Sequence, residues 1–241
     1  MKNLLTIIFF IAALVLFVQI IQAQTVEDII SKYNKTRGTA DQFLNIVSIR
    51  MEGTREILGR SFPVVVTKVQ NELSRIDFVI ADNIGYTIIT QSQGWSFIPM
   101  KSLHPEQMPE DKLKTLQDEL DIAGPTIQNE SKYIKLSLEG KEEVNGMTAF
   151  KIRVAYPSGK SIIYMIDKQT NLLIQTKQAP SANLLNENAV ELITNFSDYR
   201  MVNGILFPFR ISNASNGLMG GVMLFSKIEI NVAVAKAMYH P

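Results

Sequence analysis

Alternation of apolar and polar residues with a period of two is the feature that most constrains this chain. It starts near Asn45, where Val47, Ile49 and Met51 alternate with polar residues, and it returns in most of the later segments. Successive side chains of a strand point to opposite faces of a sheet, so the pattern predicts strands with one buried and one solvated face. The chain should therefore fold mainly as β-sheet.

Turn signals separate the alternating segments at regular intervals. Asn145-Gly146 and Asn203-Gly204 are pairs that tolerate the positive φ angles of tight hairpins. The alternating helices that connect parallel strands are missing from the pattern. We therefore expect an antiparallel meander, and a single curved sheet or barrel.

Two short helices are expected before the first strand. Thr25 and Asp28 have the spacing of a capping box, in which each side chain satisfies a backbone donor at a helix start. Apolar residues then recur at helical spacing as far as Tyr33, and Gly38 ends the segment. A brief second helix is expected over Asp41 to Leu44. The apolar stripe of the first helix must cover another part of the protein.

A third helix is expected to interrupt the strands, over Pro109 to Ile122. Proline is tolerated in the first turn of a helix, and the acidic residues that follow it suit the positive end of the helix dipole. Leu113, Leu116 and Leu120 fall on one face, which makes the helix amphipathic.

The first residues predict export. Lys2 precedes an apolar run from Leu4 to Ile21, and Ala23 suits cleavage by a signal peptidase. We interpret residues 1–23 as a signal peptide and residues 24–241 as one domain in the periplasm. The run is long enough to leave a second interpretation open, an uncleaved inner-membrane anchor that holds the domain on the periplasmic side.

Composition argues against several classes of function. The formal net charge is +1 with the basic residues dispersed, which is unsuited to nucleic-acid binding. The chain has no cysteine, and its two histidines, His104 and His240, lie in a proline-flanked loop and at the C-terminus. There is no Gly-x-Ser-x-Gly nucleophile motif. We expect no catalytic site, no metal and no cofactor.

The unusual residues are apolar, and they suggest a cavity. Large apolar residues gather before the third helix, on the helix, around Pro208 and in the last strand. Ordinary core packing is one explanation of this set, and a barrel interior that holds a ligand is the other. The candidate ligand-binding residues of cavity and lid are Trp95, Phe97, Met100, Leu113, Leu116, Leu120, Phe207, Phe209, Met219, Met223 and Phe225.

Several segments resemble a known family. They are Gly94-Trp95-Ser96-Phe97-Ile98-Pro99 with the Met-Pro-Glu-Asp helix start after it, Leu138-Glu139-Gly140-Lys141-Glu142, Tyr164-Met165-Ile166-Asp167 and Phe207-Pro208-Phe209. In these the chain resembles the outer-membrane lipoprotein-sorting proteins of the LolA/LolB-like superfamily, in the form common in Bacteroidota-type envelopes. The resemblance implies a mainly β fold, a half-open antiparallel barrel of about ten to eleven strands covered by helices, with a hydrophobic cavity for acyl chains.

The leading hypothesis is therefore a periplasmic carrier or chaperone, without enzymatic activity, that binds acyl chains of lipoproteins or lipids. The first and third helices would cover the barrel mouth, and we expect a monomer. An inner-membrane release complex or an outer-membrane acceptor is the expected protein partner. Two alternatives stay open: an envelope sensor that reads mislocalised lipoprotein and signals through a protein partner, and a structural β domain with a filled interior.

Overall fold

The structure is a computed structural model that describes residues 24–57, 59–99, 101–127, 134–179, 191–214 and 221–241. The expected signal peptide over residues 1–23 lies outside the described residues, as do two of the candidate cavity residues, Met100 and Met219.

In the described part of the chain, thirteen antiparallel strands form one sheet. Its spatial order is β6-β5-β4-β3-β2-β1-β13-β12-β11-β10-β9-β8-β7, so every strand lies beside its sequence neighbour except where β1 meets β13. The strands are β1 (Ser48–Ile57), β2 (Arg60–Val69), β3 (Leu73–Ile80), β4 (Asn83–Thr90), β5 (Gly94–Phe97), β6 (Glu106–Gln107), β7 (Lys135–Val144), β8 (Met147–Ala155), β9 (Ser161–Asp167), β10 (Leu173–Gln178), β11 (Leu192–Val202), β12 (Ile205–Ala214) and β13 (Gly221–Ile230).

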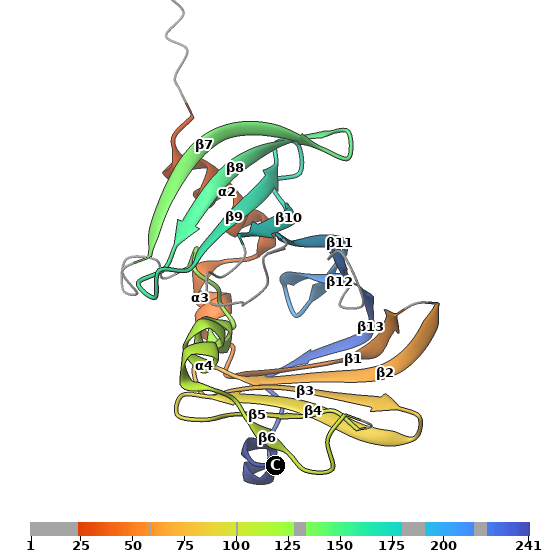
Figure 1. The fold of residues 1–241 in the computed structure, drawn as a ribbon. Helices are drawn as coiled ribbons and strands as arrows, with labels where there is room; N and C mark the ends of the chain where they lie inside the picture. Colours follow the sequence, from red (N-terminus) through yellow and green to blue (C-terminus); the bar gives the residue numbers. More distant parts are fainter. Residues whose placement is uncertain (1–23, 58, 100, 128–133, 180–190, 215–220) are drawn as a thin grey trace, which may run out of the picture.

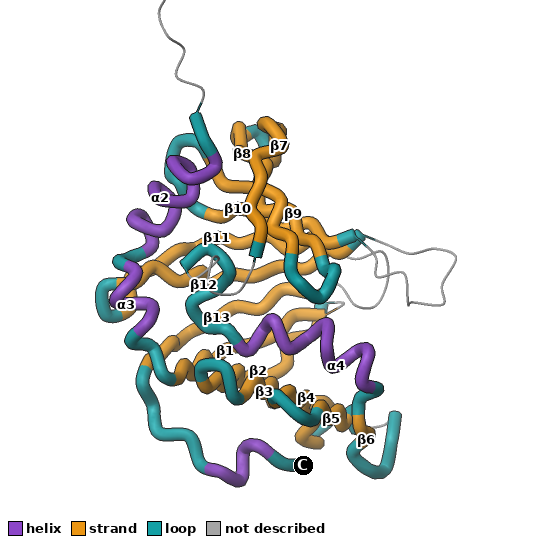
Figure 2. The backbone as a smooth tube through the Cα atoms, turned by 90° about the vertical axis from the view of Figure 1, so that its left-hand side faces the viewer, coloured by secondary structure: helices purple, strands orange, loops and turns teal. Residues whose placement is uncertain are grey.

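The sheet curls without closing. β6 and β7 are its two edges and do not pair with each other. In Figure 1 the sheet runs from β7–β10 at the top through β11–β13 to β1–β6 at the bottom. The helices α2 (Val26–Arg37), α3 (Ala40–Leu44) and α4 (Glu110–Leu116) lie along the open side, and Figure 2 shows them in front of the strands. The expected half-open antiparallel sheet with covering helices is confirmed.

The expected number of strands, ten to eleven, is wrong. Among the described residues the sheet has thirteen, because very short strands escape an alternation count. β5 has four residues and β6 has two, and β6 exists only because Glu106 and Gln107 pair with the edge of β5. Such pairing is set by the neighbouring strand and leaves no periodic pattern in the sequence.

The third helix is also shorter than expected. It is α-helical only over Glu110–Leu116, and a 3₁₀ helix, η1 (Gln117–Leu120), follows it. Asp121 is already extended, so the expected continuation to Ile122 is wrong. A 3₁₀ turn at a helix C-terminus is a common way to end a helix.

The helix starts and hairpin turns follow the sequence signals. Both side chains of the Thr25/Asp28 capping box bond to the backbone, and a second capping box at Thr39 opens α3. Asn145 and Gly146 adopt φ angles of 50° and 79° between β7 and β8, as their hairpin requires.

Strand register assigns residues to the concave or convex face. Met51 of β1 lies opposite Val66 of β2 and Ile228 of β13, and Val66 lies opposite Ile76 of β3. Directly opposed residues share a face, so these form one apolar row. The row belongs to the main core, which also includes Phe43 from α3 and thus lies on the concave side, under the helices. A second core joins α2 to β7–β11.

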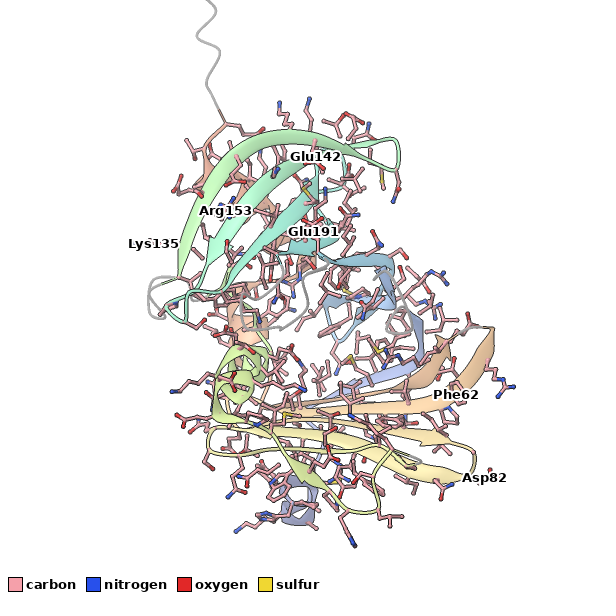
Figure 3. All side chains as sticks on the ribbon, in the orientation of Figure 1. Phe62, Asp82, Lys135, Glu142, Arg153 and Glu191 are labelled. Carbon is pink, nitrogen blue, oxygen red and sulfur yellow. The ribbon has the colours of Figure 1, made fainter. Side chains whose placement is uncertain are left out.

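Charged side chains occupy the outside of the curl. Glu142 and Arg153 lie along the upper strands β7 and β8 (Figure 3), where Glu142 forms ion pairs with Lys177 and Lys151. Hydrogen bonds from these lysines lower the pKa of Glu142. Figure 3 also shows Phe62 and Asp82 at the ends of the lower strands farthest from the helices.

Candidate functional site

The segment from α4 through residue 127, here called the lid, lies across the open side of the sheet. Leu113, Leu116 and Leu120 pack together on Ile89 of β4. The lid approaches the sheet so closely that a Cβ on Gly94 would lie 3.1 Å from Leu113 Cδ1. The concave face over β4 and β5 is therefore filled by the protein's own leucines.

Polar bonds hold one side of the lid to the turn between β2 and β3. The Gln70 side chain both donates to Asp121 Oδ1 at 2.8 Å and accepts from the backbone of Ile122 at 2.7 Å. The backbone N–H of Asn71 donates to the carbonyl of Leu120 at 2.9 Å. Each of these bonds can be replaced by a bond to water, so this side of the lid is secured by exchangeable contacts.

The other side of the lid is bonded to the opposite half of the protein. Asn34 of α2 and Thr126 exchange two hydrogen bonds of 2.8 Å. Lys160, in the turn between β8 and β9, donates to the Thr115 carbonyl at 3.1 Å and lies 4.0 Å from Asp118. Burial raises the pKa of Asp118, and the charge of Lys160 opposes that shift. The lid thus bridges the two ends of the curled sheet.

Behind the lid lies a pocket of about 360 Å³, within the usual range of small-molecule sites. Its wall combines α2, the end of the lid and the concave faces of β1, β2 and β9–β12. Most lining side chains are aliphatic or aromatic. The lining residues are Tyr33, Arg37, Ile49, Met51, Lys68, Asp121, Ile122, Ala123, Gly124, Pro125, Thr126, Ile162, Tyr164, Leu173, Thr176, Phe196, Tyr199, Phe207 and Pro208.

A second hollow, of about 350 Å³, shares Asp121 and Pro125 with the pocket. Asn71, Gln117, Asp118 and Ser158 contribute much of its wall, so it is the more polar of the two. An apolar ligand is better matched by the pocket behind the lid.

Three tyrosines near the pocket are partly buried. Burial raises the pKa of Tyr156 to about 12, and a hydrogen bond with Tyr164 opposes the shift. Burial also raises the pKa values of Tyr164 and Tyr199 well above the ordinary value. The Tyr199 hydroxyl donates to the Leu173 carbonyl at 2.7 Å. These phenols stay neutral at physiological pH and give the pocket polar but uncharged positions.

Arg37 lies against two aromatic rings of the main core and of the pocket wall. Its guanidinium carbon lies 4.4 Å from the ring centroid of Phe43 and 5.0 Å from that of Tyr33. Its Nη1 donates to the Tyr33 hydroxyl at 2.9 Å. Lys68, whose Nζ donates to the Glu119 carbonyl at 2.9 Å, supplies a second positive charge to the lining.

The structure divides the candidate cavity residues into groups. Phe207 lines the pocket, while Phe209 and Phe225 belong to the main core and Met223 packs against it. The three lid leucines meet on the concave side, but they pack on β4 and are not part of the pocket lining.

Trp95 and Phe97 lie on the convex face. Trp95 is opposite Ile88, which is opposite Arg75, and Phe97 is opposite Tyr86. This row alternates with the concave row through Ile76, so it points away from the pocket. The Phe97 ring packs on Tyr86 with centroids 5.6 Å apart.

Sequence reasoning missed much of the pocket. Arg37 follows Tyr33 by one helical turn, so the helical spacing that identified Tyr33 also places Arg37 on the same face. Tyr164 lies two residues from both Ile162 and Ile166 in β9 and so shares their face of the strand, which was a usable signal for an inward position. Tyr199 follows Asp198, whose φ of 54° distorts β11, and no local pattern indicates its direction.

Two further features are missing from the part of the chain that the structure describes. Across that part of the chain, no cluster of three His, Asp or Glu side chains could hold a metal ion. None of its helices has the length and apolar character needed to span a membrane.

Comparison with known proteins identifies the fold. No protein-family model matches the sequence, and no curated protein does. A LolA superfamily protein from Nitrosomonas europaea superposes with a TM-score of 0.57 at 10% identity, covering 91% of this chain and 99% of that one. A DUF1329 family protein from Desulfovibrio piger gives 0.59 at 14% identity, covering 90% and 98%. A domain from Vibrio parahaemolyticus, named as an outer membrane lipoprotein-sorting protein, gives 0.55 at 8% identity, covering 88% and 95%. The chain thus has the fold of the LolA superfamily over nearly the whole of these structures.

Proposed function

We propose that this protein is a non-catalytic periplasmic carrier that binds acyl chains of lipids or lipoproteins in the pocket behind the lid. The observation that carries the proposal is the pocket itself, about 360 Å³ of space with a mostly apolar wall on the concave face. A pocket filled by side chains would have favoured the structural β domain. The fold shared with a lipoprotein-sorting domain supports the same function.

The physical need for such a carrier is large. Exposing an acyl chain of about sixteen carbons to water costs on the order of 10 kcal/mol, at about 0.8 kcal/mol per methylene. A protein that moves this chain between membranes must cover it. Ile49, Met51 and Phe196 offer apolar contacts along the pocket wall.

Loading and release need an opening, and the lid is the element suited to supply it. Polar bonds join the lid to the β2–β3 turn and to α2, at Gln70 and Asn34. In our proposal these contacts yield to water when the lid opens, and the chain enters along the concave face. An inner-membrane release complex or an outer-membrane acceptor remains the proposed protein partner.

Export is part of the proposal. Lys2 and the apolar run after it are the sequence features that favour periplasmic localisation. Fractionation of cells that express the full chain tests this directly, with the protein expected in the periplasmic fraction after loss of about 2.6 kDa from its N-terminus, as removal of residues 1–23 predicts.

Lipid extraction followed by mass spectrometry tests the function. The protein is purified without detergent, and we expect acyl-containing lipid at near-stoichiometric amount. After delipidation it should bind a fluorescent acyl probe. A delipidated, folded protein that takes up no acyl probe would contradict the proposal.

A pair of matched substitutions locates the binding site. Met51→Trp puts a larger side chain into the pocket wall and should weaken probe binding at least about tenfold, because the acyl chain loses that space. Met201→Trp makes the same change at a residue that is 62% exposed and outside the lining, and should leave binding unchanged. Fluorescence titration measures both. Equal effects of the two substitutions would argue against this pocket.

A further inference from the structure

Arg37 stands out because the protein uses so little of its hydrogen-bonding capacity. A guanidinium carries five N–H donors. The Arg37 side chain donates one hydrogen bond within the described protein, to the Tyr33 hydroxyl. Two aromatic rings, of Tyr33 and Phe43, flank the cation.

No carboxylate in the described residues lies within ion-pair distance of Arg37. The side chain is only partly exposed and lines an otherwise largely apolar pocket. Removing a cation from water without a counter-charge is unfavourable, and an anion supplied by a ligand would offset that cost.

The positive charge of Arg37 acts on the pocket interior. It opposes the burial-driven rise in the pKa of Tyr164 and of Tyr199, and both tyrosines line the pocket. Lys68 adds a second cation to the lining, against one carboxylate, Asp121. The ionisable side chains of the wall therefore favour an anion.

We propose that the pocket selects amphiphiles with an anionic head group, a carboxylate or a phosphate, which Arg37 binds while the apolar wall holds the chain. The planar fork of a guanidinium matches the oxygens of both anions, and aromatic faces beside it favour a fixed orientation. This inference rests on the proposed acyl-binding function. It adds that the head group, as well as the chain, is recognised.

Ligands that differ only in the head group test the inference on the full chain. Dodecanoate, dodecyl phosphate and dodecanol share one chain length, and competition with a fluorescent acyl probe gives their affinities. We expect both anions to bind at least about tenfold more tightly than dodecanol, the usual scale of a charge-assisted hydrogen bond. Inorganic phosphate alone should compete at least about tenfold more weakly than dodecyl phosphate.

Substitutions then assign the preference to Arg37. Arg37→Met should reduce dodecanoate binding to the level at which the same variant binds dodecanol. Arg37→Lys should keep part of the preference, because it keeps the charge without the fork. Arg60→Met, on an exposed arginine outside the pocket, should keep all of it.

The possible outcomes distinguish head-group recognition from the proposed acyl-binding function. Equal affinity of the unmodified protein for dodecanoate and dodecanol overturns the inference and leaves acyl binding standing. Competition by inorganic phosphate as strong as that by dodecyl phosphate also overturns it, since the site would then recognise the free ion. Binding of none of the amphiphiles overturns both. If Arg37→Met does not fold, two measurements still test the inference. They are the head-group preference of the unmodified protein and the part of that preference that Arg37→Lys keeps.

Discussion

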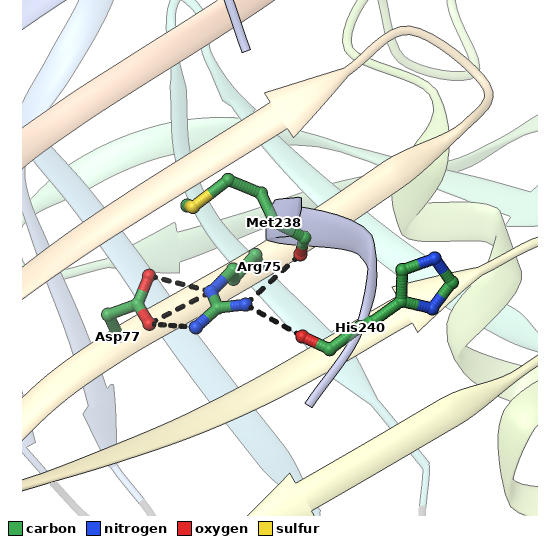
Figure 4. Close-up of polar contacts among 4 residues, drawn as sticks. All are labelled: Arg75, Asp77, Met238 and His240. Carbon is green, nitrogen blue, oxygen red and sulfur yellow. Dashed lines mark hydrogen bonds and ion pairs between the residues drawn. The ribbon is translucent and has the colours of Figure 1, made fainter. Parts of the chain in front are cut away.

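Two arginines on opposite faces of the sheet have contrasting surroundings. On the convex face, Arg75 forms an ion pair with Asp77 and donates to the carbonyls of Met238 and His240 at 3.1 and 3.2 Å (Figure 4). Its guanidinium also lies over the Tyr86 ring. On the concave face, Arg37 has two aromatic rings and one hydroxyl. The protein itself satisfies the first cation, and it leaves most donors of the second available.

This difference indicates different roles for the two faces. The bonds of Arg75 fasten the C-terminal segment, including η2 (Lys236–Tyr239), onto β3, and Tyr239 adds a bond to Glu72 at 2.9 Å. The protein's own C-terminal segment thus covers the convex face around Arg75. The pocket around Arg37 combines space, an apolar wall and a cation that forms no ion pair with the described residues, which is the pattern of a site completed by a ligand. Stability should therefore depend on Arg75, and ligand selection on Arg37.

The largest expected effect comes from Arg75→Met. The change leaves Asp77 without its partner, at a pair whose side chains are only 13% and 22% exposed, and it frees the C-terminal segment. We expect a loss of about 3 kcal/mol in the free energy of unfolding, measured by urea denaturation. Arg60→Met is the matched control. A loss below about 1 kcal/mol would remove the distinction between the two faces.

A smaller effect is expected at the contact between lid and α2. Thr126→Val keeps the shape of a buried side chain and removes its bond to Asn34. The free energy of unfolding should therefore fall by about 1 kcal/mol. Hydrogen exchange should also accelerate at Ile122 and Ala123, because the lid opens more often.

Thr67→Val serves as its control, because the Thr67 hydroxyl is also buried and forms no hydrogen bond with the described residues. Unchanged exchange in the lid of Thr126→Val would mean that this contact does not hold the lid closed.

The smallest effect on stability is expected from Arg37→Met. Methionine preserves apolar packing against Tyr33 and Phe43, and only one hydrogen bond to a neutral hydroxyl and two cation–π contacts are lost. We expect a loss of about 0.5 kcal/mol in the free energy of unfolding, measured by the same urea denaturation. A loss as large as that of Arg75→Met would assign Arg37 a structural role and break the contrast.

The sequence predicts the type of fold because its signals are local. Period-two alternation specifies strands, Asn145-Gly146 specifies a hairpin, and the Thr25/Asp28 capping box specifies the start of α2. Chain pairing at an edge is not local, so the two-residue β6 could not be anticipated. The same holds for the end of α4, where the helix tightens into the 3₁₀ helix η1.

The candidate site was predicted less well, since alternation does not say which face becomes concave. Trp95 and Phe97 formed an obvious apolar group in the sequence, yet they lie on the convex face with Arg75 and Tyr86. What covers that face is the C-terminal segment, more than a hundred residues away in sequence. The absence of an ion pair between Arg37 and the described residues is likewise set by what the fold brings near it, which no spacing within α2 can express.

The central claim is that the concave face keeps a vacant apolar pocket that shelters an acyl chain. Methyl NMR during titration of the delipidated protein with dodecanoate tests it most directly. The account predicts saturable shifts of the Met51 and Ile162 methyl signals, which line the pocket, and none at the exposed Met201. Unchanged Met51 and Ile162 signals, or shifts confined to surface methyls, would contradict it.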